Sequence, residues 1–248
     1  RSEAYALHTW SAQSWSTEAR LAAEYSRLVF SGDGNQTVDF SYLKPSFQLT
    51  RRIGEGHQAY ARIAREVGQL DFADFASAAS LSDDRIDGGN PDLKPQVAWR
   101  LEFGADLRLG AGTAFGVRAY HEWIDDVVDV VGVGDPENPI SAPGNIGAGE
   151  LYGLKVTFAT PLSPLIPGGT LKANATFQDP SVKDPITGRE RTISEFPRNE
   201  LTAEFRQDLQ HRGFAWGAKY TYESWKTEYY IDGTDRARLS PSLDIFVG

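Results

Sequence analysis

The sequence contains no cysteine and no methionine. Without cysteine, the chain can form neither a disulfide framework nor a thiolate site. Because methionine is missing even at position 1, we expect the 248 residues to begin inside a longer chain or after a removed leader. No apolar run reaches the roughly 18 residues that a membrane-spanning helix needs, so such a helix is excluded. Strands that cross a membrane are not excluded, because their polar and apolar residues alternate.

Recognisable catalytic patterns are also missing. The sequence has neither an HExxH nor a GxSxG motif, no glycine-rich phosphate loop leads into a helix, and the four histidines are scattered, at His8, His57, His121 and His211. The net charge of −9 argues against nucleic acid as a partner, since phosphate binding needs a basic surface. We therefore expect no enzymatic activity, no cofactor and no metal ligated by these histidines.

What the sequence does have is alternation. Between Val97 and Leu109 every odd position is apolar, and every even position is small or polar. A period of two is typical of a β-strand with one face in an apolar medium and the other in a polar one. At about 3.3 Å per residue this strand is about 43 Å long, and a tilt of ~45° lets it cross a hydrocarbon core of ~30 Å.

The same alternation recurs along the chain and predicts about eleven antiparallel strands in an up-and-down order. The predicted strands are Tyr5–Trp10, Trp15–Phe30, Val38–Thr50, Gln58–Val67, Val97–Leu109, Ala114–Val131, Glu150–Thr160, Thr170–Gln178, Asn199–Leu209, Phe214–Trp225 and Arg238–Gly248. From Arg51 onward, compact and long connections alternate. Alternate connections of a meander lie on opposite rims, so one rim should carry short turns and the other long loops.

Two places should interrupt this pattern. Pro45 removes a ladder donor from its strand, so we expect an irregularity or a bulge there. The long segment 68–96 lacks alternation, and residues 72–81 (FADFASAASL) are compatible with a short helix. The segments 132–149, 179–197 and 226–237 are predicted to be loops.

A soluble β-sandwich also alternates, so alternation alone does not indicate a membrane. The predicted strands, however, are longer than the roughly 5–6 residues usual in globular sheets. The apolar faces also carry tryptophans near strand ends, as the aromatic girdles of a membrane barrel do: Trp15, Trp99, Trp123 and Trp216. These features favour a transmembrane barrel over a sandwich.

One stretch resembles a known family. Asn90 to Gln96 (NPDLKPQ), followed by Leu101 to Gly104 (LEFG), is similar to the NPxLKPE…E.G run of TonB-dependent receptors, with Gln96 where the family usually has Glu. Further similarities to barrel strands of this family lie at Ile124–Val128, Asn145–Gly147 with Glu150–Val156, and Leu239–Asp244.

The resemblance covers essentially the whole chain and implies an all-β fold, an antiparallel up-and-down transmembrane β-barrel. The family barrel has about 22 strands around a plugged lumen, so residues 1–248 would form a partial C-terminal barrel domain without the plug and the early strands. It implies the cell outer membrane of a Gram-negative organism. It also implies a transport receptor that binds a siderophore, cobalamin, a metal chelate or an oligosaccharide and uses TonB-coupled energy. The implied partners are this small-molecule substrate, the plug domain, the TonB complex and outer-membrane lipid.

Site residues follow from these expectations. Substrate contact is expected from aromatic and charged side chains near the long-loop rim: Phe72, Phe75, Tyr120, Glu122, Arg189, Trp225, Tyr229 and Tyr230. The polar faces of the strands should point into the lumen and, in this family, towards the plug. These plug-facing residues are Arg100, Glu102, Asp106, Arg108, Arg118, Glu200, Glu204 and Arg206.

Two alternatives remain open. The oxygen-rich loop with Asp83, Asp84, Asp87, Asn90 and Asp92 has ligands that suit Ca²⁺, but its spacing is not that of an EF-hand, and a solvated loop is the simpler interpretation. For the function, the alternative is a non-transport outer-membrane barrel or a soluble β-sheet module for carbohydrate binding or adhesion. A plug domain encoded upstream of Arg1 would favour the receptor.

Overall fold

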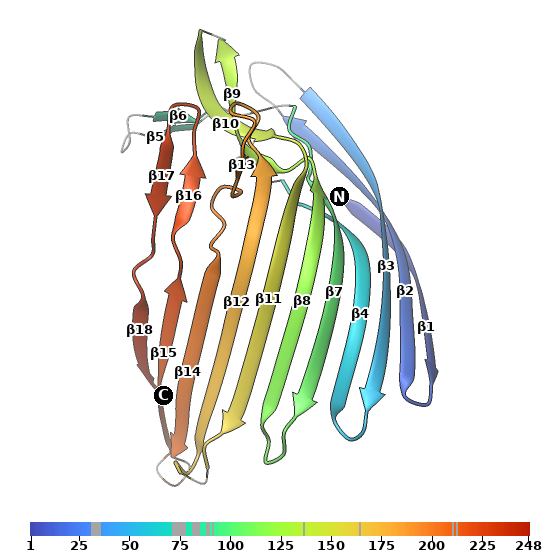
Figure 1. The fold of residues 1–248 in the computed structure, drawn as a ribbon, viewed down its shortest axis with the longest axis vertical. Coiled ribbons are helices and arrows are strands. Elements are labelled where there is room, and N and C mark those ends of the chain that lie inside the picture. The colour runs from blue at the N-terminus through green and yellow to red at the C-terminus, as the bar shows by residue number, and fades with distance from the viewer. Residues whose placement is uncertain are drawn as a thin grey trace.

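In a computed structural model, the chain consists of β-strands joined by turns and hairpins (Figure 1). The structure describes residues 1–30, 36–70, 78–80, 85–87, 90, 92–135, 137–163, 165–209, 211 and 213–248. Within this described part, no helix is long and apolar enough to cross a membrane. The strands are β1 Ser2–Ala12, β2 Trp15–Phe30, β3 Gln36–Ile53, β4 His57–Val67, β5 Ala78–Ser80, β6 Arg85–Asp87, β7 Val97–Arg108, β8 Ala114–Asp125, β9 Val128–Asp135, β10 Asn138–Asn145, β11 Gly149–Pro161, β12 Gly169–Lys183, β13 Glu190–Arg191, β14 Asn199–Leu209, β15 Phe214–Glu223, β16 Lys226–Tyr229, β17 Thr234–Ala237 and β18 Ser242–Val247.

A single antiparallel sheet of 12 strands contains most of the chain. Its hydrogen-bonded order is β1-β2-β3-β4-β7-β8-β11-β12-β14-β15-β18, with β13 attached to β12. The strands on this path match the predicted strands one to one and keep their up-and-down order. Figure 1 shows them as one continuous wall, with β1 at one edge and β18 at the other. The predicted all-β antiparallel fold is confirmed.

The two rims of this wall differ, as predicted. Tight turns join β1 to β2, β3 to β4 and β7 to β8 at the lower rim of Figure 1. At the upper rim, the chain forms additional hairpins, β5–β6, β9–β10 and β16–β17, between strands of the wall. We call this upper edge the long-loop rim.

The turn between β7 and β8 shows how the short connections close. Leu109 N–H donates to the Thr113 carbonyl at 2.9 Å, and Thr113 N–H donates to the Gly110 carbonyl at 2.8 Å. Gly110 and Gly112 have φ angles of 74° and 80°, in the left-handed region that glycine adopts without a steric penalty. These two hydrogen bonds close the turn, and the two glycines allow the chain to reverse within a few residues.

The strand predicted over Ala114–Val131 is wrong in its extent. β8 ends at Asp125, because Asp126 has a φ of 57° and a left-handed residue cannot continue a strand. The chain resumes as β9, which leaves the main sheet and pairs with β10. A hairpin therefore occupies much of the predicted loop 132–149.

Other predicted irregular segments also contain strands. The loop predicted over 226–237 is the hairpin β16–β17, and β12 continues to Lys183, past its predicted end at Gln178. Within the predicted short helix 72–81, Ala78–Ser80 is strand β5, so the helix is wrong for these residues. Residues 72–77 and 81 lie outside the described residues.

Of the irregularity or bulge predicted at Pro45, the structure shows no bulge, but the ladder between β3 and β4 does end there. The register between β2 and β3 is unbroken from Trp15 opposite Arg51 to Phe30 opposite Gln36, with Leu21 opposite Pro45. The ladder between β3 and β4 begins only at Ser46. Pro45 thus lies where β3 has a hydrogen-bonded neighbour on one side, a position that tolerates a missing N–H.

Each long strand separates polar from apolar side chains. On β7, Trp99 and Phe103 are 38% and 55% exposed, whereas Glu102 on the opposite face is only 9% exposed. Residues directly opposite each other share a face, so the register extends this division across the sheet; Glu102, for example, lies opposite Tyr120. We call the two sides the polar face, which carries Arg100 and Glu102, and the apolar face, which carries Trp99 and Phe103. A wall that exposes large apolar side chains and covers charged ones is typical of a barrel that contacts lipid.

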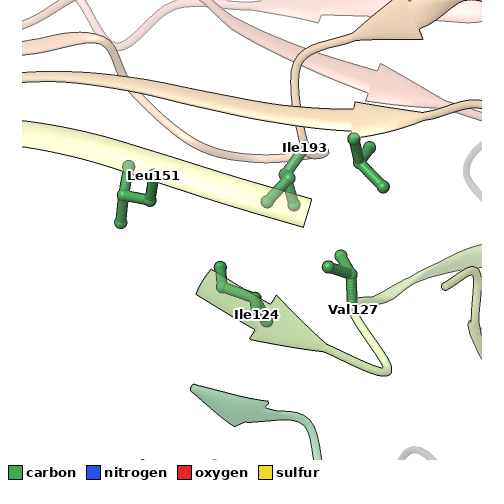
Figure 2. Packing of buried hydrophobic residues seen from close by; sticks show 5 residues of the cluster. Ile124, Val127, Leu151 and Ile193 are labelled. Carbon is green, nitrogen blue, oxygen red and sulfur yellow. The ribbon is translucent and has the colours of Figure 1, made fainter. Parts of the chain in front are cut away.

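A small hydrophobic cluster lies on the polar face near the long-loop rim (Figure 2). In Figure 2, Ile124 of β8 and Leu151 of β11 lie near Val127 and Ile193, which come from the connections of the rim. Val182 of β12 completes the buried set. Burial of one such aliphatic side chain contributes roughly 1.5–3 kcal/mol. The cluster therefore anchors two rim connections to the ends of the wall.

Candidate functional site

Three connections of the long-loop rim meet at Arg191. Its Nη1 lies 2.8 Å from Oδ2 of Asp129 at the start of β9, and its Nε lies 2.8 Å from Oδ2 of Asp184 in the turn after β12. Its guanidinium carbon lies 4.0 Å from the ring centroid of Tyr229 in β16. We call Arg191, Asp129, Asp184 and Tyr229 the Arg191 junction. One side chain thus joins the β9–β10 hairpin, the β12–β14 connection and the β16–β17 hairpin.

Backbone groups complete the junction. Ser194 N–H donates to Oδ2 of Asp129 at 3.0 Å, and Tyr229 N–H donates to Oγ of Ser194 at 3.2 Å. Val130 N–H donates to the other oxygen of Asp129 at 2.7 Å. The Asp129 side chain is 0% exposed, so the charge of its carboxylate depends on Arg191 and these donors.

Arg191 and Asp184 stay charged over a wide pH range. Burial acts to raise the pKa of Asp184, but hydrogen bonds from Thr187 and Arg191 outweigh it and lower this pKa to about 2. Burial acts to lower the pKa of Arg191, and the two carboxylates more than compensate, so this pKa lies above its ordinary value. Both partners are therefore ionised at any pH that a cell meets.

A pocket of about 570 Å³ lies beside the junction, between the segment 190–198 and the β16–β17 hairpin. Its walls share Arg191 and Tyr229 with the junction. They also carry two further arginines and two further aromatic residues: Arg198, Arg236, Phe196 and Trp225. We call this cavity the rim pocket. Cationic and aromatic groups around a concave space of this size can bind a small molecule.

The rim pocket contains two of the predicted substrate-contacting residues, Trp225 and Tyr229. Tyr230 follows in the chain, and its hydroxyl donates to Glu228 at 2.7 Å. Arg189 is exposed in the turn before β13 and does not line the pocket. The predicted contacts Phe72 and Phe75 lie outside the described residues.

Tyr120 and Glu122, also predicted to contact substrate, lie elsewhere, on the polar face of β8. Arg100 donates to Glu122 at 2.6 Å and to Glu102 at 2.8 Å. Its guanidinium carbon lies 3.9 Å from the ring centroid of Tyr120, whose hydroxyl donates to Gln178 at 3.2 Å. These two residues belong to an ion cluster within the wall, and the structure does not bring them to the rim pocket.

A second ion cluster lies on the polar face at the other side of the wall. Glu24 of β2 is 8% exposed and lies 2.8 Å from Arg1 and 2.6 Å from Lys44. Lys44 also contacts Glu3 of β1. These pairs tie the edge strand β1 to β2 and β3.

All eight residues predicted to face a plug fall on the polar face. The register places them in one alternating series: Arg100, Glu102, Asp106, Arg108, Arg118, Glu200, Glu204 and Arg206. Some are satisfied within the wall, since Asp106 accepts from Gln58 at 2.9 Å and Arg206 pairs with Asp208 at 2.8 Å. Their contact with a plug stays a prediction.

The motif at residues 90–96 has a structural role that centres on Asn145. The Asn145 side chain accepts from Lys94 N–H at 2.9 Å and donates to the carbonyls of Lys94 and Asp126 at 2.8 and 2.9 Å. Gln96 accepts from Val128 N–H at 3.2 Å, and Leu93 is 0% exposed. The motif thus holds the β4–β7 connection against the turn between β8 and β9.

The calcium candidate receives no support from its described members. Asn90 uses its side chain within the protein, donating to the Pro143 carbonyl at 3.0 Å and accepting from Asp92 N–H at 3.0 Å. Asp83, Asp84 and the side chain of Asp87 lie outside the described residues. Over the described part of the chain, no three His, Cys, Asp or Glu side chains are grouped to hold a metal ion.

Sequence reasoning missed the Arg191 junction. One local signal was present, because aspartate at the start of a turn accepts hydrogen bonds from following backbone N–H groups. Asp184 does so from Ile186 and Thr187 at 3.1 and 2.6 Å. Nothing in the sequence, however, indicates that Asp129 and Tyr229 meet the same arginine.

Three solved structures of similar fold are longer than this chain. The ferric-catecholate import receptor Fiu from E. coli K12 has a TM-score of 0.63 and 15% identity, over 99% of this chain and 36% of Fiu. The siderophore receptor PiuA from Acinetobacter baumannii has a TM-score of 0.68 and 12% identity, over 99% and 36%. The copper transporter OprC has a TM-score of 0.68 and 11% identity, over 99% and 40%. At such identities the likeness shows the fold alone, and this chain spans well under half of each protein.

A comparison with curated protein sequences found no match. The model of the family described as "TonB dependent receptor-like, beta-barrel" matches residues 1–243, nearly the entire chain. This match confirms the resemblance seen at residues 90–104 and agrees with the expectation that the chain is not an enzyme. The match covers nearly the entire chain and agrees with the antiparallel wall and its two different rims, so the chain belongs to the TonB-dependent receptor-like β-barrel family.

Proposed function

We propose that the chain is part of an outer-membrane receptor that binds a scarce solute at the long-loop rim and imports it with energy supplied through TonB. Residues 1–248 then form a C-terminal part of the barrel domain, and the plug and the early strands belong to other segments of the whole protein. The observation that carries this proposal is the division of the sheet into two faces. Exposed Trp99 and Phe103 suit lipid, and the buried ion cluster of Arg100 and Glu102 suits a polar, filled lumen.

The division into rims supports an orientation. Outer-membrane barrels have short periplasmic turns and longer extracellular loops. The long-loop rim then faces the exterior of the cell, and the rim pocket and the Arg191 junction lie where a solute arrives. Because the junction ties three connections together, part of this surface is ordered before any ligand binds, which lowers the entropic cost of binding.

The solute belongs to the compounds that such receptors collect: siderophores, cobalamin, other metal chelates or oligosaccharides. Among the structurally similar proteins, PiuA is a siderophore receptor and OprC is a copper transporter. The fold therefore accommodates different solutes, and the side chains of the rim decide between them.

A growth and uptake assay tests the proposal. The gene for the whole protein is deleted, and uptake of labelled iron chelates, copper, cobalamin and oligosaccharides is measured under limitation of each. We expect the deletion to abolish uptake of one of these solutes and the reintroduced gene to restore it only in cells with functional TonB. Restored uptake in cells that lack TonB would contradict the coupling, and a detergent-independent, soluble full-length protein would contradict the membrane barrel.

A further inference from the structure

The rim pocket concentrates positive charge in an acidic chain. The net charge of the chain is −9, yet the described residues that line the pocket include three arginines and only one acidic residue, Glu190. Arg191 is already paired with Asp129 and Asp184. The charges that the pocket offers to a ligand are therefore those of the other two arginines, Arg198 and Arg236.

Neither of these arginines is firmly occupied. Arg236 is exposed on β17 and forms no ion pair with any residue that the structure describes. The one described partner of Arg198 in an ion pair is Asp179, at 3.2 Å, and the two side chains are 59% and 68% exposed. An ion pair this exposed contributes little free energy. A ligand anion can therefore replace Asp179 at Arg198 and meet no competitor at Arg236.

The other walls of the pocket are aromatic. Trp225 is 56% exposed, and the guanidinium carbon of Arg238 lies 5.8 Å from its ring centroid, so the ring is partly accessible and itself lies beside a cation. Phe196 packs against the hydrophobic cluster, and Tyr229 is held by Arg191, so both rings are fixed before a ligand arrives. Flat rings beside guanidinium groups favour a ligand that is itself planar. The volume of about 570 Å³ falls within the range of small-molecule sites.

We infer that the rim pocket binds an anionic ligand with a planar aromatic group, whose charge contacts Arg198 and Arg236 and whose ring packs on Trp225 and Phe196. The guanidinium fork matches the oxygens of a carboxylate, a phosphate or a phenolate. The inference deepens the proposed function, because it names the chemistry of a ligand at the rim. It rests on the proposed function only in treating that ligand as a transported solute. Binding itself requires no transport.

Calorimetric titration of the full-length protein in detergent micelles tests this site. The probe is 2-naphthoate, an aromatic carboxylate, and 2-naphthamide is its uncharged analogue. We expect 2-naphthoate to bind and 2-naphthamide to bind about tenfold more weakly, because the amide offers no charge to the arginines. Raising the salt concentration should weaken only the binding of 2-naphthoate.

Three variants locate the site. Arg236→Gln and Arg198→Gln should each weaken 2-naphthoate binding by about tenfold. Arg27→Gln is the matched control, because Arg27 is an exposed arginine near the long-loop end of β2 that does not line the pocket, and it should leave binding unchanged. Unaltered heat-modifiable migration on gels shows that each variant barrel is folded.

The outcomes separate this inference from the proposed function. Absence of 2-naphthoate binding, equal binding of the acid and the amide, or an equal loss in Arg27→Gln overturns the pocket assignment. If 2-naphthoate binding depends on Arg236 but deletion of the gene impairs no uptake, the site is supported and transport is contradicted. TonB-dependent uptake together with 2-naphthoate binding that does not depend on Arg236 supports transport and overturns the site.

Discussion

The order of the long-loop rim depends on the carboxylate of Asp129. Its side chain is fully buried, and among the described residues its only cationic partner is Arg191. Removing one partner of a buried ion pair is costlier than removing an exposed pair, because the other charge remains desolvated. Arg191 also contacts Asp184 and Tyr229, so one substitution releases three connections.

Substitution Arg191→Gln should loosen the rim without unfolding the wall. Leaving the buried Asp129 carboxylate without its cationic partner costs roughly 3–5 kcal/mol of local stability. We expect amide hydrogen exchange at Ser194 and Tyr229 to accelerate at least about tenfold, while exchange in β7 and β8 stays unchanged. The control is Arg206→Gln, which removes an exposed ion pair with Asp208. Equal acceleration in both variants would show that the junction has no special role.

The pH dependence of the rim follows from Asp184. Its pKa is lowered from 3.8 to about 2, so its contribution to stability is fully present above pH 3.8 and is lost as the pH falls through 2. We expect residues 184–191 to keep their exchange protection at pH 4 and to lose it near pH 2, after correction for intrinsic rates. In Asp184→Asn, protection should be reduced at pH 7 and should not change between pH 4 and pH 2. Loss of protection centred at pH 4 in the native protein would contradict the assigned pairing.

At the scale of single residues, the sequence predicts the face that a side chain occupies better than the contacts that it makes. Which face each side chain occupies is predictable, because a strand alternates strictly and its register carries the alternation to the neighbouring strands. Trp225 and Tyr229 lie at the long-loop rim, where the alternation of short and long connections placed them, and their contact with a substrate stays a prediction. Arg191 and Asp129 were missed, because their contacts join segments far apart in sequence and follow no period. Arg236 was missed because it lines the rim pocket from a hairpin that the sequence predicted to be a loop.

At the scale of elements, the length of a strand decides whether the sequence predicts it. Strands such as β2 and β7 are long enough for alternation to stand out. Hairpins β9–β10 and β16–β17 are shorter and rest on the rim, where neither face meets a uniform medium, so their residues do not alternate cleanly. The end of β8 depends on the backbone of a single residue, Asp126, which no hydropathy pattern marks.

The apolar face of β7 can be tested by inserting charge. Phe103 lies in the middle of the strand and is 55% exposed, so Phe103→Arg should destabilise the barrel by roughly 2–4 kcal/mol if this face meets lipid at mid-depth. Asn174→Arg on the polar face of β12 is the matched control and should cost less than about 1 kcal/mol. Folding titrations of the full-length protein in lipid vesicles measure both, and equal losses would reverse the assignment of the faces.

The position of the motif at residues 90–96 depends on Asn145, whose side chain binds its backbone. Asn145→Asp keeps the acceptor for Lys94 N–H but removes the donors to the carbonyls of Lys94 and Asp126. We expect a loss of about 1–3 kcal/mol in barrel stability, measured by thermal unfolding in detergent. Asn138→Asp, an exposed asparagine at the start of the same strand, is the control and should be nearly neutral. A neutral Asn145→Asp would show that the motif is held by Leu93 and Gln96 alone.

At the scale of the whole molecule, the chain is a wall with two open edges. Within the part of the chain that the structure describes, β1 pairs only with β2 and β18 only with β15, so each leaves one row of backbone groups unpaired. Within lipid such groups cost several kcal/mol each, which a closed barrel avoids. In the proposed receptor, strands elsewhere in the protein cover both edges. Closure of this kind cannot be inferred from alternation, which reports faces and not neighbours.

The central claim is that the wall crosses the outer membrane with its long-loop rim outside, and cysteine labelling of intact cells tests it most directly. These 248 residues contain no cysteine, so a single cysteine can mark either rim. Two exposed turn glutamates form a matched pair, Glu137 between β9 and β10, and Glu55 between β3 and β4.

A membrane-impermeant maleimide is applied to cells that express the full-length protein with Glu137→Cys or Glu55→Cys, and the unaltered protein measures background. We predict that Glu137→Cys is labelled in intact cells and that Glu55→Cys is labelled only after the outer membrane is permeabilised. Labelling of both sites in intact cells, or of Glu55→Cys alone, would contradict the account.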